Sequence, residues 1–275
     1  MKYQKEKFWR YIDSGTADSV FNMATDEALA RYASSCIPVL RVYRWQPFTI
    51  SIGYHQKWQE INLEKCQKDG VDVVRRPTGG RAIFHSHEIT YSVILPRESA
   101  WFQKNTLEVY NQISSALVQG LYQLGLPVVL ERVETISPEF TQYRGSFACF
   151  ASSAKYEIHF KGKKLVGSAQ RRFKNAILQH GSIILDNEHL KLLNYLSPNG
   201  NGSTSKAREH LQQRTVCIES ILKRKVNYKD VAASLKSGFE KYFNVILQSD
   251  QLTPQELQRI NELKPKYTQF SRRVL

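Results

Sequence analysis

The stretch that decides the interpretation of this chain is RRPTGGRAIFH, residues 75–85, which follows a short apolar run at residues 71–74. Its pattern predicts a strand, a tight glycine turn and a second strand. The paired Gly79 and Gly80 allow a backbone to approach a ligand closely and to present N–H groups to an oxyanion or a carbonyl. Neither a Walker A loop nor the dinucleotide-binding fingerprint has this spacing. Two glycines alone favour an ordinary hairpin turn, whereas the arginines before them and His85 after them favour a site.

Two further stretches are candidates for chemistry. FACFA, residues 147–151, places Cys149 between aromatic residues, where a free cysteine is more often a buried apolar residue than a nucleophile. GKKLVGSAQ, residues 162–170, is by itself a basic hairpin edge, because lysine discourages strand pairing. A lysine brought beside a cysteine would favour the thiolate and make it a nucleophile. None of the three stretches decides the function alone.

Strands and helices alternate on both sides of the glycine turn. Hydrophobic periodicity predicts strands at residues 39–45, 49–53, 82–84, 89–95, 156–160 and 164–168, and helices at residues 20–32, 106–124, 228–243 and 253–263. The segment 197–205, rich in Ser, Asn and Gly, predicts a flexible surface loop before a helical C-terminal part, residues 206–275. We therefore expect an α+β fold over residues 1–275, with a mixed, largely antiparallel sheet and flanking helices.

The composition is that of a soluble globular protein, with 41% hydrophobic and 23% charged residues in 275. No apolar run approaches the roughly 20 residues that span a bilayer, and the first ten residues lack the apolar region of a secretory signal. These features predict a cytoplasmic protein without a membrane partner. The four cysteines form no C-x-x-C pair and have no histidine at ligand spacing, which argues against structural zinc and against a disulfide framework.

The formal net charge of +14 is the strongest compositional signal. Such an excess attracts polyanions, so nucleic acid and acidic carrier proteins are both candidate partners. The basic residues stand in short groups rather than in one long tract, and a solvated surface is the ordinary interpretation of each group. Charge alone does not choose between these partners.

Taken together and in order, the motifs resemble the biotin/lipoate protein ligase superfamily, and within it the octanoyltransferases of the LipM type. The resemblance covers most of the chain, through residues 22–29, 41–45, 51–56, 75–85, 88–93, 149–150, 156–158, 162–170 and 179–183. It implies a sheet-based α+β acyltransferase domain that needs no cofactor and no metal.

Two departures bear on the subfamily. ATP-using lipoate ligases usually carry three glycines where this chain has Gly79, Gly80 and Arg81, and they usually lack a cysteine at position 149. Both differences favour a transferase that does not use ATP. Position 86 is Ser where the octanoyltransferases usually have Asp, and position 87 is His. The sequence therefore leaves open what His85 pairs with.

The resemblance also implies residue roles. Cys149 would carry the acyl group as a thioester, and Lys164 would lower the pKa of that thiol and orient the acyl carbonyl. The substrate-binding residues that it implies are Arg75, Gly79, Gly80, Arg81, His85, Gly167, Ser168 and Ala169.

The reaction implied by the resemblance moves octanoyl from octanoyl-acyl carrier protein to a lysine of a lipoyl domain, that of the glycine-cleavage H protein, in lipoate biosynthesis. Three alternatives stay open: an ATP-dependent lipoate–protein ligase, an octanoyl amidotransferase between lipoyl domains, and a nucleic-acid-binding module supported by charge alone. We expect no nucleic-acid partner.

Overall fold

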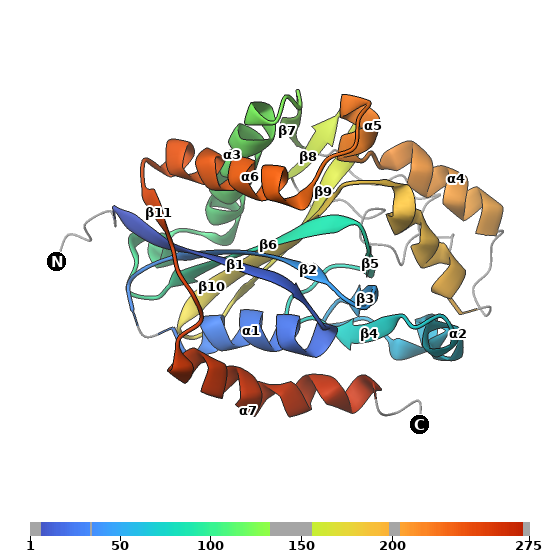
Figure 1. The fold of residues 1–275 in the computed structure, drawn as a ribbon, viewed down its shortest axis with the longest axis horizontal. Coiled ribbons are helices and arrows are strands. Elements are labelled where there is room, and N and C mark those ends of the chain that lie inside the picture. The colour runs from blue at the N-terminus through green and yellow to red at the C-terminus, as the bar shows by residue number, and fades with distance from the viewer. Residues whose placement is uncertain (1–6, 34, 133–155, 198–203, 272–275) are drawn as a thin grey trace.

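The central feature of the computed structural model is a large mixed sheet (Figure 1). The structure describes residues 7–33, 35–132, 156–197 and 204–271. In these residues eight strands form the sheet, in the order β11 (Ile246–Ser249), β1 (Phe8–Ala17), β2 (Val39–Trp45), β6 (Glu88–Pro96), β10 (Ala176–Ile184), β9 (Lys163–Arg172), β8 (Tyr156–Phe160) and β7 (Val129–Arg132). β1 pairs in parallel with β11 and β2, and the other neighbours are antiparallel. The expected α+β class with a largely antiparallel sheet is confirmed.

A second, smaller sheet carries the glycine-turn stretch. In the part of the chain that the structure describes, it has three strands in the order β4 (Asp72–Arg75), β3 (Thr49–Ile52) and β5 (Ile83–His85). β3 pairs in parallel with β4 and antiparallel with β5. The strands before and after the glycines therefore lie on opposite sides of β3. Residues 75–85 are a crossover, and the alternative of an ordinary hairpin turn is wrong.

Helices cover both faces of the large sheet (Figure 1). α3 (Thr106–Gln123) and α6 (Tyr228–Phe243) lie on one face, and α1 (Ser19–Arg31) and α7 (Pro254–Ser271) lie on the other. Shorter helices complete the described residues: η1 (Trp58–Glu60), α2 (Leu63–Lys68), η2 (Ala100–Gln103), η6 (Asn187–Tyr195), α4 (Thr204–Arg214) and α5 (Ile218–Leu222). No helix among the described residues is both long and apolar enough to cross a membrane.

α3 and α6 enclose the main apolar core against the sheet. Trp9 of β1 and Tyr91 of β6 are buried there with Leu117 and Phe239 of the two helices. The helices approach so closely that a Cβ on Gly120 would lie 2.8 Å from the Ser234 carbonyl oxygen. This face of the sheet has a structural role, because its side chains pack into a continuous core.

α1 differs from an ordinary surface helix because it is buried almost all round. Asp18 caps it, with Oδ1 accepting the Phe21 N–H at 2.7 Å. α1 lies between the sheet and α7, and its Glu27 carboxylate accepts hydrogen bonds from Lys266 and Tyr267 of α7. Polar side chains in such a helix need fixed partners, since unpaired buried polar groups are costly. The buried polar residues of α1, among them Asn22, Asp26 and Glu27, must therefore be bonded to other elements.

Some observed strands were not predicted, and some predicted elements differ from the observed ones at their ends. β1, β7, β10 and β11 were not predicted, and β11 adds a strand to the expected helical C-terminal part. β9 runs to Arg172 where the prediction stopped at residue 168, and α7 continues through Pro265 to Ser271. α4 begins at Thr204, inside the expected loop 197–205, while residues 198–203 lie outside the described residues.

Candidate functional site

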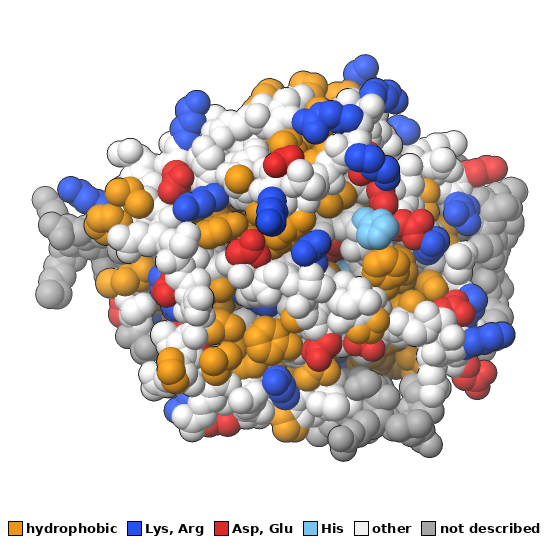
Figure 2. Space-filling view, in the orientation of Figure 1, with side chains coloured by type: hydrophobic (Ala, Val, Ile, Leu, Met, Phe, Trp, Pro, Cys, Tyr) orange, Lys and Arg blue, Asp and Glu red, His pale blue; other side chains and the backbone are white. Residues whose placement is uncertain are grey.

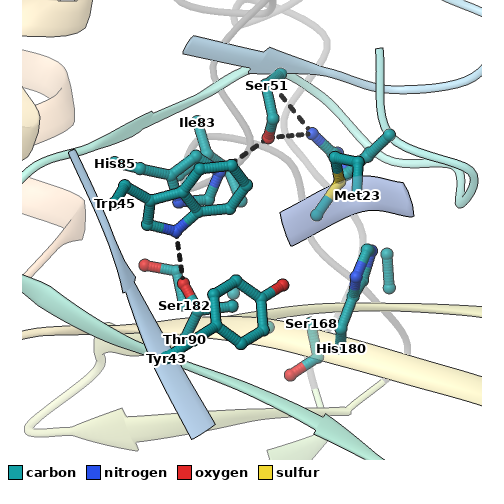
Figure 3. A pocket seen from close by; sticks show the side chains of 14 residues that line it. Met23, Tyr43, Trp45, Ser51, Ile83, His85, Thr90, Ser168, His180 and Ser182 are labelled. Carbon is teal, nitrogen blue, oxygen red and sulfur yellow. Dashed lines mark hydrogen bonds between the residues drawn. The ribbon is translucent and has the colours of Figure 1, made fainter. Parts of the chain in front are cut away.

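A pocket lies where α1 and the small sheet meet the polar face of the large sheet (Figure 3). It is lined by residues of both sheets, of α1 and of the crossover: Met23, Tyr43, Trp45, Ser51, Arg76, Ile83, His85, Thr90, Gly167, Ser168, Ala169, His180, Gly181 and Ser182. Stretches far apart in sequence meet here, including residues 75–85 and 162–170. Many of the lining side chains are polar, and hydrogen bonds to one another or to side chains behind the lining occupy their polar atoms. The surface that they leave for a ligand is therefore mainly carbon.

His85 lies at the centre of one buried hydrogen-bonded array. Its Nδ1 is 2.7 Å from Glu88 Oε1, and its Nε2 is 2.7 Å from Ser51 Oγ. The Trp45 ring stacks on the imidazole with 4.1 Å between centroids, and the indole N–H donates to Thr90 Oγ1 at 2.7 Å. The partner of His85, which the sequence left open, is Glu88.

A second array of the same kind is built around His180. Its Nδ1 is 2.8 Å from Asp26 Oδ2, and its Nε2 is 2.6 Å from Thr78 Oγ1. Burial is the main reason that the pKa of His180 lies below its usual range, so the imidazole is neutral near pH 7. A carboxylate can only accept, so Nδ1 carries the proton and Nε2 accepts from the Thr78 hydroxyl. This array fixes Thr78, immediately before the two glycines.

Asp26 stays charged because of its partners. Arg41 Nη1 donates to Oδ1 at 2.7 Å, and the Tyr43 hydroxyl donates to Oδ2 at 2.8 Å. Burial would raise the pKa of the Asp26 carboxyl, but Arg41 and His180 outweigh it and hold that pKa below its usual range. Both partners of the Asp26–Arg41 pair are fully buried, so removing either one leaves an uncompensated charge. The pocket wall is therefore rigid on the α1 side.

The side chain of Arg76 fixes the conformation of the glycine turn. Its guanidinium donates to the carbonyl oxygens of Gly79 at 2.9 Å, Arg81 at 2.6 Å and Ser51 at 2.9 Å. Gly80 has a φ of +85°, and a Cβ there would lie 2.8 Å from Arg76 Nη2. The turn therefore requires glycine for its backbone conformation and also for the space that the guanidinium occupies.

The predicted substrate-binding residues divide into two groups. His85, Gly167, Ser168 and Ala169 line the pocket, whereas the predicted residues of the turn, Gly79, Gly80 and Arg81, lie outside its lining. Arg75 also lies outside it. Its guanidinium donates to the carbonyl oxygens of Gly53, Tyr54 and Gln56, and so holds the loop after β3. The arginine that does reach the pocket is the neighbouring Arg76, which the sequence did not single out.

A β-bulge determines where Lys164 points. Ile158 of β8 pairs with Val166, but the next residue, His159, pairs with Lys164, so Leu165 is the extra residue of the bulge. Leu165 and Val166 are both buried in the main core. The extra residue turns Lys164 onto the opposite face, the polar face of the sheet that also carries the pocket. Lys164 is buried there, while Lys163 is exposed.

Lys164 is the first member of a chain of charged groups. Its Nζ donates to Glu157 Oε1 at 2.6 Å, and both side chains are buried. The other Glu157 oxygen lies 3.2 Å from His159 Nε2, and His159 Nδ1 lies 3.1 Å from Glu131 Oε2. Burial opposes the charge on His159, but the two carboxylates outweigh it and raise the pKa of the imidazole. This series of charged side chains holds the ammonium group of Lys164 in place on the polar face of the sheet.

The described cysteines do not provide a nucleophile for the pocket. Burial raises the pKa of the Cys66 thiol to about 12, which keeps it protonated and inert. Cys217 is also buried, and Cys36 is exposed; neither is among the described residues that line the pocket. Cys149, the predicted nucleophile, lies outside the described residues. Within the described part of the chain, no cluster of three or more His, Cys, Asp or Glu side chains is arranged to hold a metal ion.

Comparisons with known proteins identify the family of this chain. The sequence model of the lipoyl protein ligase A/B catalytic domain matches residues 18–240. The chain belongs to this family. It is 39% identical to octanoyltransferase LipM of Bacillus subtilis over 94% of this chain and 95% of that protein. It is 35% identical to octanoyltransferase LipM of Lysinibacillus sphaericus, with the same shares of both chains covered. The resemblance that the motifs indicated is confirmed.

Solved structures of lipoate ligases share the fold. The structure titled lipoate-protein ligase A bound with ATP superposes with a TM-score of 0.75 at 23% identity, and 94% of each chain is covered. A bipartite lipoate protein ligase from Thermoplasma acidophilum gives a TM-score of 0.76 at 22% identity, over 96% of this chain and 93% of that one. At this identity the likeness shows the fold alone.

Proposed function

We propose that this member of the family is an octanoyltransferase of lipoate biosynthesis, with Cys149 as the acyl carrier and Lys164 as its basic partner. The observation that carries the proposal is the pocket itself. Its surface is mainly carbon, and β9 lines it at Gly167 and Ala169 and then leads to the buried ammonium of Lys164. An apolar chain fits such walls, and a reacting carbonyl fits a fixed positive charge.

The acyl chain would gain binding energy from the pocket without breaking the hydrogen bonds of its walls. Each methylene group removed from water contributes about 0.8 kcal/mol. The polar atoms of His85 and His180 already have protein partners, so an apolar ligand leaves none of them unsatisfied. A polar chain would have to compete with these hydrogen bonds. The pocket therefore favours an apolar acyl chain over a polar one.

The reaction that we propose has two acyl-transfer steps. The Cys149 thiolate attacks the thioester carbonyl of the donor, a new C–S bond forms, and the carrier thiolate leaves. The ε-amine of the acceptor lysine then attacks octanoyl-Cys149, an amide bond forms, and Cys149 leaves as thiolate while the amine loses a proton. Lys164 would stabilise both the thiolate and the developing oxyanion. Because the donor is already a thioester, the reaction needs no ATP.

The glycine turn is a proposed part of the pocket wall. A Cβ on Gly80 would lie 3.8 Å from the Ala169 Cβ, and the Thr78 hydroxyl is bonded to His180, so the turn lies beside Ala169 and His180 rather than beside Lys164. Arg76 binds the carbonyl oxygen of Gly79 and so restricts how that turn can rotate. The turn therefore keeps its shape before substrate arrives.

The proposed partners are octanoyl-acyl carrier protein as donor and a lipoyl domain, that of the glycine-cleavage H protein, as acceptor. On the face shown in Figure 2, lysine and arginine side chains stand in separate groups among acidic ones, and many lie over α5 and α6. The net charge of +14 would speed encounter with acidic proteins. Separate groups suit protein docking better than a continuous nucleic-acid track. A cytoplasmic location stays a prediction.

A transfer assay with matched donors tests this proposal against its alternatives. Octanoyl-acyl carrier protein, free octanoate with ATP, and an octanoylated lipoyl domain are each offered with unmodified H protein as acceptor. We expect octanoyl-H protein from the first donor alone. Product that requires free octanoate and ATP would establish a ligase, and product from the octanoylated lipoyl domain alone would establish an amidotransferase.

A further inference from the structure

The pocket has two ends along the direction of β9. Gly167 pairs with Ser182, and Ala169 pairs with His180, so His180 marks the end farther from Lys164. Lys164 precedes Ala169 by five residues, one of which is the extra residue of the bulge, so the distance corresponds to about four strand steps, or roughly 13 Å at about 3.3 Å per residue. In Figure 3, Met23 and His180 lie on one side of the pocket, with Trp45 and His85 on the other. Met23 therefore lies at the end distant from Lys164.

Met23 differs from its neighbours in how it is held. Hydrogen bonds fix His180 to Asp26 and Thr78, and fix Tyr43 to Asp26. Met23 has no group that bonds in this way, and its thioether chain rotates about three bonds. It is buried, with 1% of its surface exposed, and it projects from α1 into the pocket. It can be shortened or enlarged without leaving a buried polar group unpaired.

We propose that the Met23 side chain closes the distal end of the pocket and so sets the longest acyl chain that the enzyme accepts. This inference rests on the proposed function, because it assigns the carbonyl of the acyl group to the Lys164 end. The ligand it implies is a straight medium-length acyl group whose methyl end meets the Met23 thioether. Trimming Met23 then admits additional methylene groups, and a bulkier side chain excludes some.

The size of the effect follows from the burial of methylene groups. Met23→Ala removes three heavy atoms, space for about two further carbons of the ligand. If both become buried, the kcat/KM ratio of decanoyl to octanoyl donor rises roughly fifteenfold, the equivalent of about 0.8 kcal/mol for each methylene. Met23→Phe should shift the preference in the opposite direction, toward hexanoyl.

A matched control is available at the other end of the pocket. Ile83 of β5 also presents an apolar side chain to the pocket, but it lies beside Ser51 and His85. Ile83→Ala removes a similar volume next to the predicted position of the carbonyl. We expect it to slow all donors together and to leave the ratio of decanoyl to octanoyl within about twofold of the wild type.

The experiment offers hexanoyl, octanoyl, decanoyl and dodecanoyl carrier proteins in competition to the wild type and the three variants. Intact-mass spectrometry then measures the acyl mass on each enzyme, and thermal melting confirms that each variant is folded. Opposite shifts for Met23→Ala and Met23→Phe, with no shift for Ile83→Ala, are the expected result. An acylated wild type with unchanged preference in both Met23 variants would overturn this inference alone. A wild type that takes up no acyl group would instead overturn the proposed function.

Discussion

Replacing Lys164 should cost stability as well as activity, because the lysine is half of a buried ion pair. Its Nζ lies 2.6 Å from Glu157 Oε1, and the two side chains are 6% and 4% exposed. Removing one partner of a buried pair typically costs about 3–5 kcal/mol, since the other charge stays buried without compensation. His159 also contacts Glu157 and compensates for part of the loss. We therefore expect Lys164→Ala to lower the free energy of unfolding by about 3 kcal/mol.

The remaining compensation by His159 makes this loss depend on pH. The pKa of His159 is raised in the folded protein above its ordinary value of 6.5. The stability that it contributes is complete below that ordinary value and is lost as the pH rises through the raised pKa. The destabilisation by Lys164→Ala should therefore be larger at pH 9 than at pH 6.

A double-mutant cycle measured by urea unfolding tests this reasoning. The variants are Lys164→Met, Glu157→Gln and the two together, with Lys163→Ala as the exposed control. Either single change should destabilise strongly, and the double variant should recover about 2 kcal/mol while still failing to transfer octanoyl. Lys163→Ala should change the free energy of unfolding by less than about 0.5 kcal/mol. A coupling energy below about 0.5 kcal/mol would show that the pair is no stronger than an exposed salt bridge, and would refute the argument.

Three further predictions concern the nucleophile, the turn and the charge. Cys149→Ala should abolish acyl-enzyme formation, measured by intact mass, while changing any of the other three cysteines to serine should not; an active Cys149→Ala variant would exclude the covalent route. Gly80→Val should abolish acyl-enzyme formation and lower Tm by a few degrees, because the φ of Gly80 is +85°. The control is Gly70→Val: the φ of Gly70 is +68° and no atom lies within 4 Å of an added Cβ, so this variant should lower Tm and leave acylation intact. Raising the salt concentration should lower kcat/KM for octanoyl-acyl carrier protein more than it lowers kcat, because at 0.15 M salt charges attract each other only over about 8 Å. Replacing the exposed Lys161 and Lys163 should make kcat/KM depend less on salt. A rate that salt leaves unchanged would contradict docking by charge.

Two arginines close to the pocket are unsuitable for the salt experiment. Arg171 and Arg172 lie at the end of β9, just after its pocket-lining segment. Arg171 donates to the Pro77 carbonyl at 2.7 Å, and Arg172 donates to the carbonyl of Phe102 at 2.6 Å. Replacing either one would disturb these contacts as well as the charge. The exposed lysines between β8 and β9 are therefore the better choice.

The sequence predicted the parts of the fold that depend on local pattern. Residues 39–45 and 228–243 were predicted with the boundaries that the structure has, because apolar periodicity and flanking turn residues mark both. β1 was missed because its sequence, FWRYIDSGTA, does not alternate regularly. Its strand conformation is stabilised by β2 and β11, which pair on either side of it. Long-range pairing of this kind cannot be read from one segment.

The sequence motifs predicted which stretches form the site, but not which side chains contact one another there. The stretch 162–170 was recognised, and the structure separates its buried Lys164 from the exposed Lys163 by a bulge that no local pattern revealed. The array around His180 was out of reach, because Asp26 and His180 stand 154 residues apart. The partner of His85 was missed although Glu88 is the third residue after it, because sequence spacing alone does not show which side chains meet. A signal for Asp26 was present, since it is a polar residue in a helix with no clear polar face. That signal could be interpreted only once the fold was known.

The central claim is that octanoyl passes through a thioester on Cys149 without ATP. The most direct test mixes the purified protein with octanoyl-acyl carrier protein alone and records the intact mass of the protein before and after hydroxylamine. We expect the mass to increase by one octanoyl group, to return to its starting value with hydroxylamine, and to stay unchanged in Cys149→Ala. A wild-type protein that gains no mass until ATP and free octanoate are supplied would contradict the account.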